Sequence, residues 1–343
     1  MSSKYFWLFS LGLLISVSTS AQVDSTDGDL LDYSNFSDAA GVKRYATQKT
    51  INQSPTKIIS LGYEYQSGFD MPMVPQDMIS TNKTDYSVRS MSGFRGQINL
   101  PVISNDKIIW QLGANYWGSK MLIKEKPASK FEQSLQEVGL HTAGLQTTIF
   151  KPLDEKHWLI IQASADANAA FKTFADINHK AFTYSATAIY GWKYSDKKMV
   201  GVGVARTYRA GALLHVPVLL WNQTFNDTYG MELLLPARGF IRRNFSTSSM
   251  LQLGYELEGN QYYIPGAGPQ NELFVQRGEM KPKIMWDQKV NGFIWLNLQA
   301  GLRLNWRFDA MNTRNGKEDK DLFYSANLGN PLFFAISLNF VSP

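Results

Sequence analysis

Asp176 and His179 are the first residues to weigh for chemistry, because a carboxylate three positions before an imidazole can orient a general base. The surrounding segment, 168–180, is polar and is better interpreted as a solvated loop. No serine and histidine fall on neighbouring strand positions, as a serine lipase site would require. We therefore expect no catalytic site and a protein that is not an enzyme.

Metal and cofactor sites are equally absent from the sequence pattern. The chain has no cysteine, which excludes a thiolate zinc site, a cysteine nucleophile and a disulfide framework. The acidic run at 24–29 lacks the spacing and the closing glutamate of a calcium loop. No glycine-rich phosphate loop or nucleotide fingerprint is present. We expect neither a metal nor a cofactor.

Charged residues of both signs recur opposite an apolar face in several segments. If the apolar face is turned to lipid, these charges line the interior of a closed barrel. The candidate lumen-lining residues are Glu64, Arg95, Asp166, Glu256, Glu258, Arg277, Lys281, Lys283, Arg303 and Arg307. The same faces also carry Lys193, Arg209, Glu279 and Asp287. Two interpretations stay open: a sealed polar core in which the charges pair, or a narrow solute path that they border.

The elements that would position these charges are long amphipathic strands. In 293–307, seven apolar residues alternate with polar ones, and the same period of two recurs along most of the chain. Strands of soluble sandwiches average about 5–6 residues, whereas a tilted transmembrane strand needs about 9–11. Aromatic residues near the strand ends, such as Tyr63, Tyr190 and Trp306, match the interfacial girdles of a membrane barrel. The alternative is a soluble extracellular β-protein with the apolar face in a core.

The pattern predicts about twelve strands of an all-β, antiparallel transmembrane barrel, with ten to fourteen as the range. They cover 57–67, 88–100, 107–117, 138–151, 158–167, 181–194, 199–209, 213–225, 249–258, 272–287, 293–307 and 330–341. Short connections alternate with longer ones, as periplasmic turns alternate with extracellular loops. Segment 226–248 would give an odd strand number and contains Pro236, so we expect an inward or periplasmic excursion there.

The N-terminus is typical of an exported protein. Residues 1–21 combine Lys4, an apolar stretch at 8–17 and small residues before Gln22, which predicts a signal peptide cleaved near Ala21. Residues 22–55 form a polar leader with little expected order, and the barrel occupies 56–343. No later stretch approaches the roughly 18 apolar residues of a transmembrane helix. We expect the cell outer membrane as the location.

A family resemblance rests on segment 201–263. It contains Gly201-Val-Gly-Val-Ala-Arg-Thr-Tyr-Arg-Ala-Gly211, Val216-Pro-Val-Leu-Leu220, Phe225-Asn-Asp227, Glu232-Leu-Leu-Leu-Pro-Ala-Arg238 and Gly254-Tyr-Glu-Leu-Glu-Gly-Asn-Gln-Tyr262. With these motifs the chain resembles an uncharacterised outer-membrane β-barrel family of Gram-negative bacteria. The resemblance implies a location and an architecture, but no reaction or ligand. The chain departs from many such barrels at its end, where Phe340 is followed by three further residues.

These observations favour a narrow pore or passive transport barrel with a mixed-charge lumen. The alternative is a sealed barrel that serves as a structural or binding scaffold in the cell envelope. The expected partners are the lipid bilayer, the outer-membrane assembly machinery during biogenesis, and an unidentified small solute or envelope component. The net charge of +5 is spread along 343 residues, so a nucleic-acid partner has no support.

Overall fold

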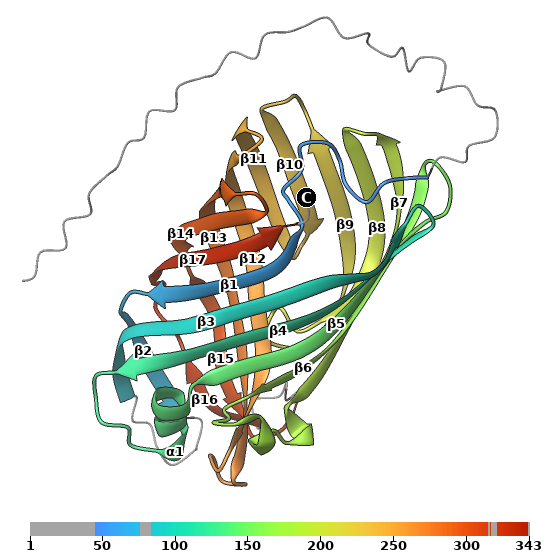
Figure 1. Ribbon diagram of the computed structural model, residues 1–343. Helices are drawn as coiled ribbons and strands as arrows, with labels where there is room; N and C mark the ends of the chain where they lie inside the picture. Colours follow the sequence, from blue (N-terminus) through green and yellow to red (C-terminus); the bar gives the residue numbers. More distant parts are fainter. Residues whose placement is uncertain (1–44, 76–83, 315, 317–320, 342–343) are drawn as a thin grey trace, which may run out of the picture. The chain divides into compact units, whose positions relative to one another are not determined.

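A computed structural model describes residues 45–75, 84–314, 316 and 321–341. The expected signal peptide and most of the expected leader lie outside these residues. Within the described ranges, seventeen strands dominate the chain (Figure 1). They are β1 (Lys57–Gln66), β2 (Phe69–Pro75), β3 (Thr84–Asn105), β4 (Ile108–Ile123), β5 (Leu140–Pro152), β6 (His157–Ala169), β7 (Phe182–Ser195), β8 (Lys198–Thr207), β9 (Leu214–Thr224), β10 (Tyr229–Leu235), β11 (Arg238–Ser246), β12 (Ser249–Pro265), β13 (Glu272–Asn291), β14 (Ile294–Leu302), β15 (Leu304–Met311), β16 (Leu322–Ala326) and β17 (Leu332–Val341).

Helical turns occupy two of the connections. They are α1 (Lys130–Gln133), η2 (Ser134–Val138), η3 (Phe174–Asp176) and η4 (His179–Ala181). The side chain of Ser129 accepts a hydrogen bond from the backbone N–H of Phe131, and Glu132 reaches back to Ser129, so α1 begins with a capping box. None of the helices in the described ranges is long and apolar enough to cross a membrane.

The strands form one closed antiparallel barrel whose wall is fourteen strands wide. β1 and β2 both pair with β3, and β14 and β15 both pair with β13, so each couple is one wall strand with an interruption. β16 and β17 form a third interrupted strand, in which β16 pairs with β15 and β17 with β14. Pairing of β17 with β1, and of β16 with β2, closes the ring.

Each of the twelve expected segments contains a wall strand, and the difference in number comes from 226–248. This segment is not an excursion: β10 and β11 pair with each other, β10 also pairs with β9, and β11 with β12. Pro236 lies in the two-residue connection between them, where no ladder hydrogen bond is needed, rather than in the middle of one strand. The hairpin adds two short strands to the wall and preserves even parity.

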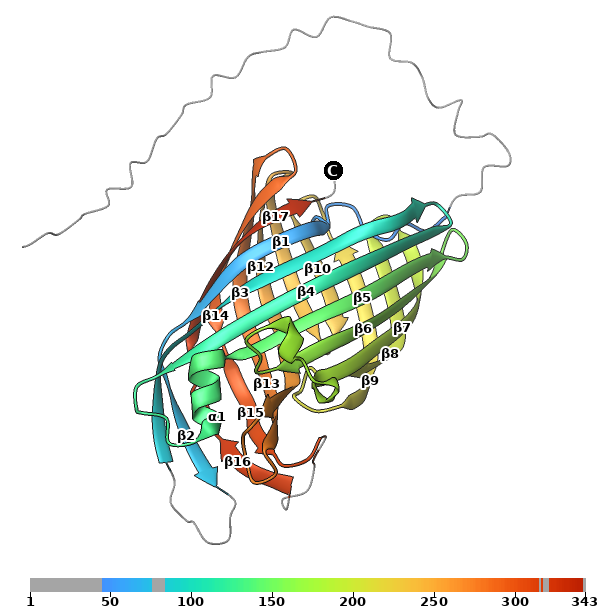
Figure 2. The same cartoon turned by 60° about the horizontal axis from the view of Figure 1, so that its bottom comes forward.

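The two ends of the barrel differ in their connections. We call one the turn end, because short links at 106–107, 153–156, 196–197, 225–228, 247–248 and 292–293 lie there. The opposite end, here the loop end, carries α1 and the 170–181 connection (Figure 2). β1 begins at the turn end and β17 ends there, so the described chain enters and leaves the barrel on that side.

The outer surface of the wall is a belt of exposed apolar side chains. Leu61, Phe94, Leu145, Val204 and Leu253 are each more than 40 % exposed at outward positions of five different strands. Because a soluble protein rarely exposes such a continuous apolar surface, the belt indicates contact with lipid. Period-two alternation therefore has the direction that the sequence predicted, with apolar residues outward and polar residues inward.

The barrel narrows toward the loop end. β11 pairs with β12 only as far as Glu256, and beyond that level β12 lies against β6, where Tyr263 pairs with Ala169. The narrow half is filled by a buried apolar cluster, which we call the loop-end core. Its buried members are Met71, Met73, Tyr86, Val88, Met91, Met121, Ile123, Phe131, Leu135, Leu140, Ala170, Tyr262, Ile264, Ala267, Leu273, Val275, Phe308, Ala310, Ala326 and Leu328.

Candidate functional site in the barrel interior

A layer of paired charges crosses the interior next to the loop-end core, on its turn-end side. We call it the ionic layer, and it consists of Glu64, Arg95, Glu256, Glu258, Arg277, Glu279, Lys281, Lys283 and Arg303. Five cationic side chains thus face four carboxylates. They come from β1, β3, β12 and β13 and from the link between β14 and β15, so the layer joins segments that lie far apart in the sequence.

Arg303 is the centre of the ionic layer. Its guanidinium pairs with Glu64 and Glu279, and its Nη2 atom lies 3.3 Å from Oε2 of Glu258. The side chain is 0 % exposed and also lies over the ring of Phe333, 5.7 Å from the ring centre. A guanidinium offers five N–H donors, which is why one arginine can serve three carboxylates at once.

Lys281 and Arg95 share two of the same carboxylates. Lys281 Nζ lies 2.7 Å from Glu258 Oε2 and 3.6 Å from Glu64 Oε2. Arg95 lies 2.5 Å from Glu258 and 3.3 Å from Glu64, and its guanidinium stacks on Trp117 at 3.9 Å. Glu64 and Glu258 therefore each have three cationic partners, so neither carboxylate depends on a single cation.

The remaining pairs extend the layer in both directions along β13. Toward the loop end, Arg277 Nη2 lies 3.2 Å from Glu279 and 3.7 Å from the sulfur of Met91. Toward the turn end, Lys283 Nζ lies 2.7 Å from Glu256 and 3.1 Å from the amide oxygen of Gln299. These side chains share one face because they occupy alternate positions of a strand.

Exposure differs among the side chains of the layer. Those of Arg95 and Glu256 are 35 % and 29 % exposed, whereas those of Glu279 and Lys281 are 2 % and 3 % exposed. Arg95 and Glu256 therefore border a space inside the barrel on the turn-end side of the layer. On the loop-end side, the loop-end core fills the interior next to the layer.

A break in the wall places Arg303 in the layer. β14 ends at Leu302 and β15 begins at Leu304, and the backbone N–H of Arg303 donates to Pro331 O at 2.9 Å instead of continuing the ladder with β13. The other two interrupted wall strands, β1–β2 and β16–β17, break beside it, where Ser67 N donates to Leu332 O at 2.9 Å. Three neighbouring wall strands are thus irregular at the level of the ionic layer.

Two of the ten expected lumen-lining residues lie outside the ionic layer, and the other eight belong to it. Asp166 is held by Asn115 at 3.3 Å and Ser164 at 3.0 Å, away from the layer. Arg307 pairs with Asp309 at 3.0 Å, on the face opposite to Phe308 in the loop-end core. The register shifts between Gly278 and Glu279 of β13, so that β15 carries an extra residue there. This bulge turns Arg307 away from the interior, and the expected lumen position of Arg307 is wrong.

Asp176, which was weighed for catalysis together with His179, makes structural contacts, and so does His141 on β5. The carboxylate of Asp176 accepts from the backbone N–H and hydroxyl of Thr173, at 2.9 and 3.0 Å, which caps η3 and lowers the pKa of Asp176. His141 contacts the hydroxyl of Tyr116 at 2.9 Å and Val138 O at 2.8 Å. Within the described ranges, no three side chains of His, Asp or Glu lie close enough together to hold a metal ion.

The last part of the expected leader is ordered and lies against the interior of the turn end. We call residues 45–56 the strap. It passes from the β5–β6 turn, where Ala46 N donates to Asp154 O at 3.0 Å, to the start of β1 (Figure 1). On the way, Ile51 N donates to Asp196 O at 2.8 Å, and Ser54 donates to both oxygens of Glu232 at 2.9 and 2.6 Å.

Inward-facing wall residues hold the strap mainly through its carbonyl groups. Arg242, which is 0 % exposed, donates to the carbonyl of Asn52, and Thr224 Oγ1 donates to Ile51 O at 2.6 Å. Lys193 Nζ donates to Lys49 O at 3.0 Å. Lys193 lies on an inward face, as expected from the alternation. Arg242 was not expected there because it belongs to segment 226–248, and Thr224 was not expected because it carries no charge. No alternation marks the strap itself.

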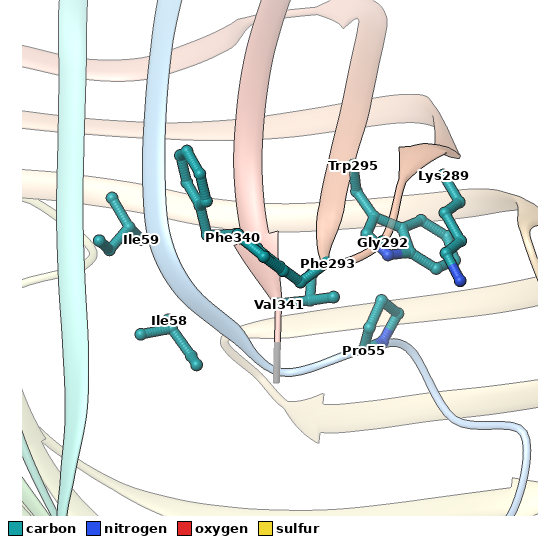
Figure 3. Close-up of a pocket in the computed structure, with 9 residues that line it drawn as sticks. All are labelled: Pro55, Ile58, Ile59, Lys289, Gly292, Phe293, Trp295, Phe340 and Val341. Carbon is teal, nitrogen blue, oxygen red and sulfur yellow. The ribbon is translucent and has the colours of Figure 1, made fainter. Parts of the chain in front are cut away.

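A cavity of about 810 Å³ lies beside the point where the strap joins β1. Figure 3 shows its lining: Pro55, Ile58, Ile59, Lys289, Gly292, Phe293, Trp295, Phe340 and Val341. Pro55 belongs to the strap, while the other residues lie on β1, β13, β14, β17 and the β13–β14 turn. The cavity therefore lies between the end of the strap and the strands that close the barrel.

Comparison with protein families identifies the family of this chain. Residues 59–340 match the family DUF6268, which is described as a domain of unknown function. The chain belongs to this family. The match covers the whole barrel from β1 to β17, which agrees with the resemblance seen in segment 201–263 and gives an architecture without an activity. No curated protein matches the sequence.

Solved structures similar to this family member are outer-membrane barrels. An outer membrane channel from Pseudomonas putida F1 is 9 % identical, with 83 % of this chain and 96 % of that chain covered and a TM-score of 0.37. A Pseudomonas aeruginosa FadL homologue is 9 % identical over 83 % and 90 % of the two chains, with a TM-score of 0.39. The outer membrane protease OmpT from Escherichia coli is 10 % identical over 86 % and 100 %, with a TM-score of 0.30. These similarities are too distant to assign a location or a solute to this chain.

Proposed function

We propose that this protein is a transport channel of the outer membrane, closed in this conformation, with the ionic layer as its constriction. The observation that carries the proposal is the ionic layer itself. A barrel of about eight strands is filled by its own side chains, whereas one of 16–18 strands encloses water, and fourteen strands lie near the second case. An interior built only for stability would favour apolar residues, since a buried ion pair is often no better than apolar side chains of equal volume.

Shared partners make the ionic layer suited to rearrangement. If Lys281 leaves Glu258, Arg95 and Arg303 still lie within 3.3 Å of that carboxylate. A passing anion could therefore pair with Lys281 while Arg95 and Arg303 keep the Glu258 carboxylate compensated in a medium of low dielectric. Five cations against four carboxylates further favour an anionic solute over a cationic one.

A sealed scaffold is the second candidate, and the loop-end core favours it. Its members Met71, Met91 and Phe308 are at most 2 % exposed, and the core fills the narrow half of the barrel. In a sealed scaffold, the ionic layer has only a structural role, in which its charged side chains pair with one another next to the apolar loop-end core. Transport requires the loop-end core to move as well, or a solute to leave beside it.

Ion selectivity of the refolded protein distinguishes the two candidates. Lys283 lies on the turn-end side of the layer, so Lys283→Glu should shift the preference of the channel toward cations by several-fold in a salt gradient. Lys107→Glu, in the β3–β4 turn outside the lumen, is the matched control and should leave selectivity unchanged. Equal selectivity of both variants and the parent protein would remove the ionic layer from the solute path.

A further inference from the structure

The strap differs from the rest of the barrel in how it is held. Wall strands are joined by continuous backbone ladders, whereas the strap has backbone hydrogen bonds at only a few points, including Ala46 and Ile51. Its other contacts are made by wall side chains that donate to strap carbonyl groups. Arg242 donates to two successive carbonyls, of Asn52 and Ile51, and Asn244 Nδ2 donates to Asn52 O at 3.1 Å.

The groove that holds the strap thus recognises the backbone of a turned segment more than particular side chains. Every residue type has a backbone carbonyl oxygen. A groove whose side chains donate hydrogen bonds to carbonyl groups can therefore bind a peptide of almost any sequence. Specific contacts are few: Ser54 with Glu232, and Thr47 with Lys193. Asn52 has a positive φ of 54°, which lets the strap turn so that its carbonyl meets Arg242 and Asn244.

Release of the strap leaves few unsatisfied groups behind. Arg242 keeps Glu232 at 3.3 Å and Thr224 at 2.5 Å, and Lys193 keeps Asp196 at 3.4 Å. Water reaches the turn end, so the donors that lose strap carbonyls can be hydrated. The cavity beside Pro55 gives the strap room to move at its attachment to β1. Only Ala46 joins a buried apolar cluster, together with Trp158 of β6.

We propose that the strap is a releasable lid, bound in a groove of the turn end that recognises peptide backbone. When it is released, the space above the ionic layer widens toward the turn end. The consequence for conduction rests on the proposed transport function, whereas the binding and release of the strap do not. Because the strap stays tethered at β1, it rebinds without leaving the protein.

A disulfide that locks the strap tests the effect on conduction. Ile51 N and Asp196 O are 2.8 Å apart, so the backbones at Ile51→Cys and Asp196→Cys are close enough for a disulfide, and the chain has no other cysteine. In single-channel recordings we expect the oxidised protein to open at least tenfold less often than the same sample after reduction. The pair Ser195→Cys and Lys198→Cys bridges the same turn without the strap and should show no such difference. Equal opening of the oxidised and reduced strap-locked protein would overturn the lid.

Thiol accessibility tests strap release without relying on conduction. Thr50 belongs to the strap and is 4 % exposed when the strap is bound. The reaction of Thr50→Cys with a bulky maleimide therefore reports release of the strap. Adding Thr224→Val, which removes the hydroxyl that donates to Ile51 O, should raise the labelling rate at least fivefold. Arg242→Gln should raise it more, in samples whose heat-dependent gel shift shows a folded barrel. Unchanged rates in both variants would contradict the lid, whereas faster labelling without any current would support the lid and contradict the transport function.

Discussion

Lys281 and Glu258 form a 2.7 Å ion pair inside a barrel whose outer surface faces lipid, and both side chains share Glu64 and Arg303 as neighbours. Glu258 is partly exposed, whereas Lys281 is buried. In the proposed channel this level is the barrier to the solute, because the loop-end core fills the interior beside it.

Loss of Arg303 should destabilise the barrel strongly. Arg303→Gln removes one of three cationic partners of Glu64 and one of two of Glu279, both of which are buried, so the cost should approach the roughly 3 kcal/mol of a broken buried ion pair. The measurement is the urea midpoint for unfolding from lipid vesicles. Arg307→Gln is the matched control, because Arg307 makes one partly exposed pair with Asp309, worth about 1 kcal/mol or less. Similar midpoints for the two variants would contradict the central role of Arg303.

A charge on the outer belt should impair membrane insertion. Leu253 is 62 % exposed on β12, so Leu253→Arg places a guanidinium in lipid at a cost of about 2 kcal/mol or more. The fraction of protein that folds into vesicles, read from the heat-dependent gel shift, should fall. Ser248→Arg in the β11–β12 turn should fold as the parent protein does. Equal folding of both variants would show that Leu253 does not face lipid.

The β5–β6 turn should weaken in acid. The carboxylate of Asp154 accepts from the backbone N–H groups of Lys156 and His157 at 2.7 Å, and these hydrogen bonds lower its pKa to about 2. A carboxyl group with a lowered pKa stabilises the folded turn above its ordinary pKa of 3.8, and this contribution is lost as the pH falls toward 2. Hydrogen exchange of the His157 amide should accelerate over that range relative to Asp154→Asn, in which the effect is absent at every pH. A parallel pH profile in the variant would remove Asp154 from the cause.

Strap binding should strengthen in alkali. Burial lowers the pKa of the Lys49 ammonium from 10.5 to about 8, while the nearby carboxylate of Glu232 opposes this shift. Because the released strap binds more protons than the bound strap between pH 8 and 10.5, binding becomes more favourable as the pH rises through this window. The labelling rate of Thr50→Cys, divided by that of the exposed Lys107→Cys at the same pH, should therefore fall between pH 8 and 10. Lys49→Met should abolish this pH dependence, and its persistence in that variant would contradict the role of Lys49.

Alternation along the chain was sufficient to predict most of the wall, for a physical reason. A strand between lipid and a polar interior must alternate at every position, so 293–307 and 249–258 indicate strands without any long-range information. Pro236 misled the count, because a proline in a tight turn between two short strands has the same sequence signature as one that breaks a strand. The wall contains both short strands, and the number rises from twelve to fourteen.

The candidate site was less accessible to sequence reasoning. Alternation placed Arg303 and Glu64 on inward faces, but their contact joins residues 239 positions apart and depends on how the barrel closes. The bulge near Trp306 reverses the faces of the following residues, so Arg307 was assigned to the wrong side. The strap has neither period nor motif, and its contacts with Arg242 exist only because β10 and β11 belong to the wall.

Single-channel conductance of the refolded mature protein in planar bilayers tests the central claim most directly. A heat-dependent gel shift on the same sample shows that the barrel is folded. The transport function predicts discrete and reproducible current steps, whose frequency rises when Thr224→Val loosens the strap. A folded barrel that passes no current, in the parent protein and in Thr224→Val alike, would contradict the channel and leave the sealed scaffold.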